Sequence, residues 1–275
     1  MFKLGYNTNG FTNHSLISAI DVIGSSGYQS IAITIDHHSL NPGDKNLESQ
    51  IEQVKTQLDQ YRLSSILETG ARFLLDPYQK HEPTLISNTL EKRQIRIQFI
   101  ENCMDIAASL GSDCVSIWSG KKPMGVEDDQ VWEWLISACR HLACKARQHN
   151  IVIAFEPEPG MFVENMTQYR FLKQQVNHPC FKLTLDLGHA LISEVDVIDT
   201  IHAYKTDIIN IHLEDMKKNH HEHLFFGQGD MDFNRIFFAL NQIAYTGQVN
   251  IELSRHSHNA VEISKAAFNF LRQIK

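Results

Sequence analysis

Short runs of apolar and β-branched residues alternate along the chain with longer amphipathic stretches, almost without interruption. The apolar runs are bounded by turn residues, a pattern typical of strands that are buried on both faces of a parallel sheet. We therefore expect eight strands, over residues 3–7, 30–36, 65–69, 113–118, 151–156, 181–186, 208–213 and 249–253.

The stretches between these runs show helical periodicity, most clearly over residues 91–110 and 233–244 and at the end of the chain. Asn259 precedes the last stretch and Glu262 follows three residues later, which predicts a capping box. Eight strands alternating with about eight helices predict a single-domain (β/α)8 TIM barrel over residues 1–275, with its active site at the C-terminal ends of the strands. An open doubly wound sheet is the alternative, but no G-x-G-x-x-G motif follows the first strand.

Composition narrows the classes of function. The chain has 275 residues, of which 43% are hydrophobic and 21% charged, so disorder is excluded. Its formal net charge of −7 argues against a nucleic-acid partner, which needs a basic surface. Five cysteines without a C-x-x-C pair favour a reducing, cytoplasmic compartment. No stretch approaches the roughly 20 apolar residues that cross a bilayer, so we expect no membrane partner.

Candidate chemistry lies at the ends of the last four predicted strands. Glu156 ends the fifth, Asp186 the sixth, and His212 and Glu252 lie in the seventh and eighth. In a barrel these ends surround one mouth, where three carboxylates and an imidazole would repel one another unless a cation neutralised them. Oxygen and nitrogen donors of this kind suit Mn²⁺, Co²⁺, Mg²⁺ or Zn²⁺.

Three motifs carry a family resemblance. They are Asp186-Leu-Gly-His189, His212-Leu-Glu-Asp215 and the Gly-Gln-Gly-Asp-Met-Asp-Phe stretch over 227–233. With them the chain resembles the xylose-isomerase-like TIM-barrel superfamily, which includes sugar and sugar-phosphate isomerases and epimerases and apurinic-site nucleases of the endonuclease IV type. The resemblance implies one divalent metal, and the residues that it implies as ligands are Glu156, Asp186, His212 and Glu252.

The resemblance also implies an activity: isomerisation or epimerisation of a small sugar, sugar phosphate or related keto-polyol through an enediolate. Glu156 and Glu252 would act as acid and base from opposite sides of the reacting carbons, with His189 as a substrate or second-metal ligand. Family epimerases carry a further acidic residue, for which Glu158 or Glu164 is the candidate. They also carry an Arg where this chain has Lys218, so the details of substrate binding stay open.

The segment His220-His221-Glu222-His223 has two interpretations. His221 and His223 would point the same way from an extended segment and, in the nuclease branch, the matching place binds an additional zinc together with the counterpart of His189. A second Zn²⁺ on His189, His221 and His223 is one interpretation, and a solvated His-rich loop is the other. The first would fit a two- or three-metal hydrolase or lyase, although the nuclease histidines after the third and fourth strands are absent here.

Three more side chains lie at or just after strand ends and are candidates for substrate binding. Arg72 and Arg255 could bind an anionic group, or each could form a salt bridge to a neighbouring loop. Trp118 could pack against the apolar face of a sugar ring. Besides the isomerase and hydrolase hypotheses, a third interpretation is a metal-containing barrel that binds a ligand without turnover, because this fold hosts many functions. Apolar residues on the outer helices could serve a homodimer or ordinary barrel packing.

Overall fold

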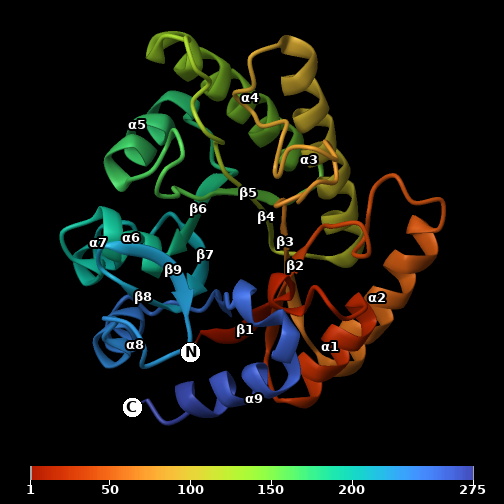
Figure 1. The fold of residues 1–275 in the computed structure, drawn as a ribbon, viewed down its shortest axis with the longest axis vertical. Helices are drawn as coiled ribbons and strands as arrows, with labels where there is room; N and C mark the ends of the chain where they lie inside the picture. Colours follow the sequence, from red (N-terminus) through yellow and green to blue (C-terminus); the bar gives the residue numbers. More distant parts are fainter. Residues whose placement is uncertain (1, 275) are drawn as a thin grey trace. The chain divides into compact units, whose positions relative to one another are not determined.

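The structure is a computed structural model that describes residues 2–274. Eight parallel strands close into a barrel in the order β1-β10-β7-β6-β5-β4-β3-β2 (Figure 1), so the predicted TIM barrel is confirmed. All eight predicted strands are present, and most end one or two residues earlier than expected. Their bounds are β1 Lys3–Asn7, β2 Ser30–Thr34, β3 Ser64–Glu68, β4 Cys114–Ile117, β5 Val152–Phe155, β6 Phe181–Asp186, β7 Ile208–Leu213 and β10 Gln248–Ile251.

The expected helices over 91–110 and 233–244 are also confirmed, as α3 and α8. The α-helices are α1 Leu16–Ser25, α2 Leu47–Tyr61, α3 Leu90–Leu110, α4 Asp128–Gln148, α5 Met166–Val176, α6 Leu187–Ser193, α7 Val197–Ala203, α8 Phe233–Gln242 and α9 Ala260–Leu271. Two 3₁₀ helices, η1 (Thr8–Phe11) and η2 (Ser254–Asn259), follow β1 and β10. The predicted capping box was wrong: Asn259 makes no side-chain cap hydrogen bond, because η2 runs directly into α9.

The chain divides into two compact units, whose boundaries fall inside β2, α2, β3 and β6. The first unit comprises residues 1–33, 52–65 and 184–275. In it β1 pairs with β10, and β10 pairs with β7 so that Asn250 lies opposite His212. The apolar residues Ile211, Val249 and Ile251 are fully buried. The polar side chains that follow these strands are therefore held by a rigid apolar base.

The second unit comprises residues 34–51 and 66–183. Its strands pair in sequence order, β3 with β4, β4 with β5, and β5 with β6 as far as Leu183. The rings of Phe155, Tyr169 and Phe181 pack together here, with centroids 5.8–6.5 Å apart. This aromatic cluster anchors α5 on the sheet.

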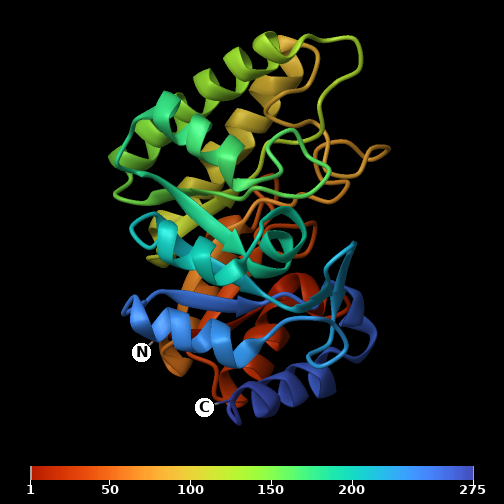
Figure 2. The same ribbon diagram turned by 90° about the vertical axis from the view of Figure 1, so that its left-hand side faces the viewer.

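The long connection after β7 folds into an antiparallel hairpin instead of an irregular loop. Its strands are β8 (Asp215–Lys217) and β9 (His220–Leu224), beside α6 in Figure 1, and Figure 2 shows it extending away from α8 and α9. The Asp215 carboxylate accepts hydrogen bonds from the backbone N–H groups of Gly227, Gly229 and Met231, at 2.8, 2.8 and 3.1 Å. This carboxylate thereby ties the segment that opens α8 to the base of the hairpin.

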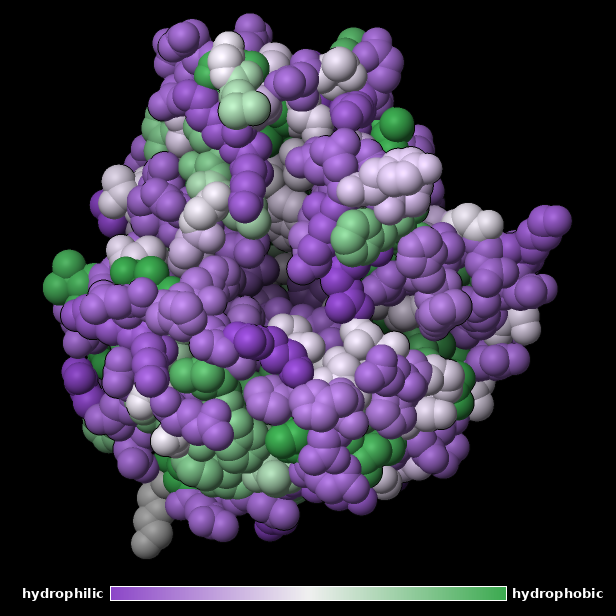
Figure 3. All heavy atoms as spheres, in the orientation of Figure 1, coloured by the Kyte–Doolittle hydropathy of each residue, from purple (hydrophilic) through white to green (hydrophobic). Residues whose placement is uncertain are grey.

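Within residues 2–274, no helix combines the length and the apolar character that crossing a bilayer requires. The face seen in Figure 3 is mostly hydrophilic with scattered apolar patches. Individual large apolar side chains are exposed, among them Phe238 on α8. Singly exposed apolar residues of this kind are normal for a folded surface.

Candidate metal centre

Asp186, His212 and Glu252 converge in the first unit. Each offers a ligand atom within 4.8 Å of those of the other two. His212 Nδ1 lies 3.0 Å from Glu252 Oε2 and 3.9 Å from Asp186 Oδ2. Asp186 and His212 are almost completely buried, so the three side chains meet where water cannot easily screen their charges.

Both carboxylates are held in the charged form. Burial by itself raises the pKa of Glu252, but the His212 ring, through its charge and its hydrogen bond, lowers that pKa below the usual range. Burial likewise opposes ionisation of Asp186, and the imidazoles of His189, His223 and His212 outweigh it, so that its pKa is also lowered. A cluster of charged oxygens beside an imidazole is what a divalent cation needs.

One oxygen of this group has no hydrogen-bond donor among the described residues. Asp186 Oδ1 accepts a hydrogen bond from the backbone N–H of His189 at 2.7 Å, as the N-cap of α6. The other oxygen, Oδ2, is buried and has no hydrogen-bond partner. Because buried carboxylate oxygens are normally satisfied, this atom fits a metal ligand, and the donor set is compatible with a divalent cation.

Glu214 is a buried carboxylate that sequence reasoning missed. It is 0% exposed, and within residues 2–274 no donor reaches either of its oxygens. Its neighbour Asp186 is itself a carboxylate, so a hydrogen bond between the two requires one of them to be protonated. Burial, followed by the charges of Asp186 and Glu252, raises its pKa well above the ordinary value. A Cβ atom on Gly188 would lie 2.0 Å from Glu214 Oε1, so only glycine leaves room for this side chain. Strand alternation could have found it, since Glu214 follows His212 by two residues.

His189, His221 and His223 form a second group, again with ligand atoms within 4.8 Å of one another. The Nε2 atoms of His189 and His221 lie 2.9 Å apart, and His223 Nδ1 lies 3.1 Å from the carbonyl oxygen of Glu252. Burial lowers the pKa of His189 to about 4 and also lowers that of His221. These two rings are therefore neutral near pH 7, the state in which imidazole binds metals.

The second unit holds the predicted residues Glu156 and Glu158. Glu156 directly follows β5, is 8% exposed, and donates its backbone N–H to the carbonyl of Ile117 at 2.8 Å. Glu158 lies in the loop that follows and donates its backbone N–H to the carbonyl of Val163 at 3.1 Å. The functional roles of both residues stay predictions.

Arg72 and Trp118 lie in the same unit and have defined neighbours. Arg72 binds one oxygen of Asp36 through Nε and Nη2, at 3.2 and 2.9 Å, which is the salt-bridge alternative. The Trp118 ring packs edge-on against His81, and the buried Arg96 guanidinium lies 5.1 Å from its centroid. Trp118 is thus held in place from two sides.

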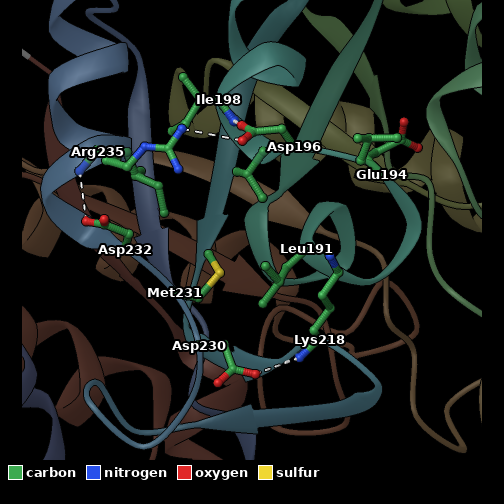
Figure 4. Close-up of a pocket in the computed structure, with 12 residues that line it drawn as sticks. Leu191, Glu194, Asp196, Ile198, Lys218, Asp230, Met231, Asp232 and Arg235 are labelled. Atoms are coloured by element: carbon green, nitrogen blue, oxygen red, sulfur yellow. Dashed lines mark hydrogen bonds and ion pairs between the residues drawn. The ribbon is translucent and has the colours of Figure 1, made fainter.

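The two other predicted substrate-binding residues, Arg255 and Lys218, belong to the first unit. Arg255 forms an ion pair with Glu222 in the hairpin. Lys218 lines a cavity of about 200 Å³ together with Leu191 and Arg235, and its backbone N–H donates to Asp230 at 3.1 Å (Figure 4). Asp186, His212 and Glu252 are not among the residues that line this cavity.

The barrel and its cluster of carboxylates and imidazoles define the class as a TIM barrel with a candidate metal centre. Residues 20–274 match the family model of the xylose isomerase-like TIM barrel. The chain therefore belongs to this family, and the resemblance seen in its motifs is confirmed.

Curated relatives of the chain include sugar epimerases. L-ribulose-5-phosphate 3-epimerase UlaE of Salmonella typhi is 36% identical over 123 residues, which cover 44% of this chain and 43% of that protein. An inosose dehydratase of Lacticaseibacillus casei is 25% identical over 148 residues, 48% of this chain and 49% of that protein. The matched part thus spans about half the length of these relatives.

Solved structures share the fold over the whole chain. The 3-keto-D-glucoside 4-epimerase YcjR of E. coli has a TM-score of 0.81 at 17% identity, covering 99% of this chain and 100% of that one. The D-allulose 3-epimerase of Methylomonas sp., in complex with D-allulose, has a TM-score of 0.80 at 20% identity, covering 100% and 97%. The IOLI protein with a bound zinc atom has a TM-score of 0.77 at 17% identity, covering 98% and 96%. At these identities the likeness shows the fold alone.

Proposed function

We propose that the protein is a divalent-metal-dependent isomerase or epimerase that acts on a small sugar, sugar phosphate or related keto-polyol. The observation that carries this proposal is the convergence of Asp186, His212 and Glu252 beside a buried carboxylate oxygen that has no hydrogen-bond donor among the described residues. UlaE, YcjR and the D-allulose epimerase are each named as sugar epimerases, which supports the same type of chemistry here.

Asp186, His212, Glu252 and Glu156 are the proposed metal ligands. Glu156 is included because it directly follows β5, the neighbour of β6 in the strand order, and because the family resemblance implies it. Three carboxylates and one imidazole suit Mn²⁺, Co²⁺, Mg²⁺ or Zn²⁺. When bound, such an ion would polarise the carbonyl group of a ketose and so stabilise an enediolate.

The chain's own carboxylates move the protons. Glu252 takes a proton from the carbon next to the carbonyl group, since it is charged before substrate binds and so is able to accept one. For epimerisation Glu156 starts in its protonated form and donates its proton to the other side of that carbon, which inverts the carbon and leaves Glu252 protonated and Glu156 charged. For isomerisation Glu252 returns the proton that it took, now to the adjacent carbon. Glu158, Arg72, Arg255, Lys218 and Trp118 are retained as proposed substrate contacts.

The test combines metal content with proton exchange. Elemental mass spectrometry of the purified protein should find at least one divalent metal per chain, and NMR in D₂O should show deuterium entering a ketose such as D-allulose or D-fructose. Glu252→Gln should lose the exchange, while Glu52→Gln, an exposed change on α2, should retain it. Failure of every ketose and keto acid to exchange, with metal bound, would leave a non-catalytic barrel as the better description.

A second function has its own supporting observation, the grouping of His189, His221 and His223. We propose these three residues as a second cation site, for which zinc is the natural candidate because all three donors are imidazoles. The hydrogen-bond distance from His223 Nδ1 to the Glu252 carbonyl supports this, since ring nitrogens of metal ligands are commonly held in this way. Two zinc ions per chain would favour a hydrolase or lyase.

Substitution separates the two sites. His221→Ala together with His223→Ala should lower zinc content by one ion per chain and leave the first metal bound. If the parent cleaves a phosphodiester substrate and this variant does not, the hydrolase hypothesis is supported. Unchanged zinc content would mean that the histidines form a solvated surface instead.

We also propose a cytoplasmic location and a small carbohydrate-like molecule as the partner. No disulfide joins any of the five cysteines, which supports a reducing compartment. A homodimer is proposed as the assembly to test first, by light scattering.

A further inference from the structure

Asn9 directly contacts the proposed acid–base carboxylate from the opposite end of the chain. β1 and β10 pair in parallel with Tyr6 opposite Ile251, so the residues that follow these two strands lie side by side. Asn9 Nδ2 donates a hydrogen bond to Glu252 Oε1 at 2.7 Å. Both residues belong to the first unit, and 243 positions separate them in the sequence.

The backbone of Asn9 is held in place by three local features. Its N–H donates to Asn7 Oδ1 at 3.0 Å, and its carbonyl accepts a hydrogen bond from Ser257 Oγ at 3.2 Å. Gly10 allows η1 to pack closely, because a Cβ atom there would lie 2.9 Å from the Tyr6 ring and 3.2 Å from the Leu253 carbonyl oxygen. The amide is therefore presented to Glu252 by a rigid turn.

The two oxygens of Glu252 have different neighbours. Oε2 lies 3.0 Å from His212 Nδ1, on the side of the proposed cation, whereas Oε1 accepts from Asn9. A neutral amide donor stabilises the charge of the carboxylate without competing for it as an ammonium group would. The other amide atom, Asn9 Oδ1, is buried and has no hydrogen-bond partner within the described residues. It is therefore a hydrogen-bond acceptor, next to Glu252, that lacks a donor.

We propose that Asn9 is the residue that positions Glu252, and that its Oδ1 accepts a hydroxyl hydrogen of a polyhydroxy substrate. The second contact rests on the proposed ketose chemistry, and the first rests only on the proposed cation site. Asn9 fixes which oxygen of Glu252 faces the cation and leaves one hydrogen-bond acceptor for the substrate. A buried acceptor that lacks a donor favours ligands that supply one.

Two variants separate the contacts. Asn9→Asp keeps the size and an acceptor but places an oxygen where the donor was, against Glu252. Asn9→Ala removes both contacts. Asn13→Asp, at an exposed position in the following turn, adds the same charge without touching Glu252 and is the matched control. Circular dichroism establishes that all three variants are folded.

The first readout is Mn²⁺ affinity by calorimetry without substrate. Both Asn9 variants should bind Mn²⁺ about 10- to 100-fold more weakly, the usual effect of removing a residue that orients a metal ligand, and Asn13→Asp should match the parent. Parent-like Mn²⁺ affinity in both folded Asn9 variants would overturn the positioning role.

The second readout is the kinetics on the ketose that exchanges fastest. Both variants should lower kcat, but only Asn9→Ala should also raise KM several-fold, because Asn9→Asp retains the acceptor. Equal KM values in the two variants would overturn the hydroxyl contact. If no ketose reacts, the proposed function fails and the hydroxyl contact with it, while Mn²⁺ affinity still decides the positioning role.

Discussion

Replacing Glu214 by Gln should stabilise the metal-free protein, although most changes of a buried residue destabilise. The Glu214 carboxylate is completely buried, and among the described residues no donor reaches either of its oxygens. Its pKa is raised well above the ordinary value, by burial first and then by the charges of Asp186 and Glu252. Glutamine has nearly the same shape and removes the charge.

The expected size follows from the cost of leaving a charged group without a partner. Such a group costs about 1–3 kcal/mol or more, so the free energy of unfolding should rise by about that amount at pH 8. In a chain near this size each kcal/mol moves Tm by about 2–4 °C, so the shift should be at least about 2 °C.

The dependence on pH has a definite sign. Because the pKa of Glu214 is raised in the folded state, its contribution to stability is fully present below the ordinary value, near 4.5. That contribution is lost as pH rises towards the raised pKa of the folded state. Without metal, the parent should therefore lose more stability than Glu214→Gln as pH rises. Saturating Mn²⁺ should reduce the difference, because a cation nearby stabilises the carboxylate.

The assay is thermal and urea unfolding in EDTA between pH 5 and 8.5, with Glu52→Gln as the exposed control. A Glu214→Gln protein that is less stable than the parent at pH 8, or that shows the same dependence on pH, would refute the reasoning. The substitution would then have weakened the hydrogen bond that the protonated Glu214 carboxyl makes with Asp186.

Three further outcomes are expected. Gly188→Ala should lower Tm and weaken Mn²⁺ binding in calorimetry, since its Cβ would lie 2.0 Å from Glu214 Oε1 and overpacking costs about 1–3 kcal/mol. A Tm and an Mn²⁺ affinity equal to those of the parent would contradict this. Arg96→Met should reduce the free energy of unfolding, measured in urea, by about 2–4 kcal/mol, because the buried guanidinium donates a hydrogen bond to the Thr69 carbonyl at 2.5 Å. An unchanged urea midpoint would show that this hydrogen bond contributes little. The free energy of unfolding should fall by up to about 3 kcal/mol as pH drops from 6.5 towards 4, because burial lowers the His189 pKa to about 4 and the unfolded chain binds the proton first. His189→Asn should flatten this part of the pH profile measured by urea unfolding. An unaltered slope in that variant would contradict the prediction.

The order of elements in this protein was readable from local sequence. Apolar runs between turn residues identified all eight barrel strands, because a strand buried on both faces needs apolar residues at nearly every position. Parallel strands place their C-terminal ends together, so the polar residues that end them could be named in advance. The structure brings Asp186, His212 and Glu252 within ligand distance of one another, and their role as metal ligands stays a proposal.

Other features depended on contacts that no local pattern encodes. Asn9 reaches Glu252 across 243 residues, and only the pairing of β1 with β10 makes them neighbours. In the tertiary structure Arg72 pairs with Asp36 and Arg255 with Glu222, and substrate binding by either arginine stays a proposal. The sequence by itself determined the eight barrel strands, with their ends placed to within one or two residues, and the helices over 91–110 and 233–244, because periodic burial is a local property. Only the tertiary structure decided the partner of each polar group, because that depends on distances between segments remote in the chain.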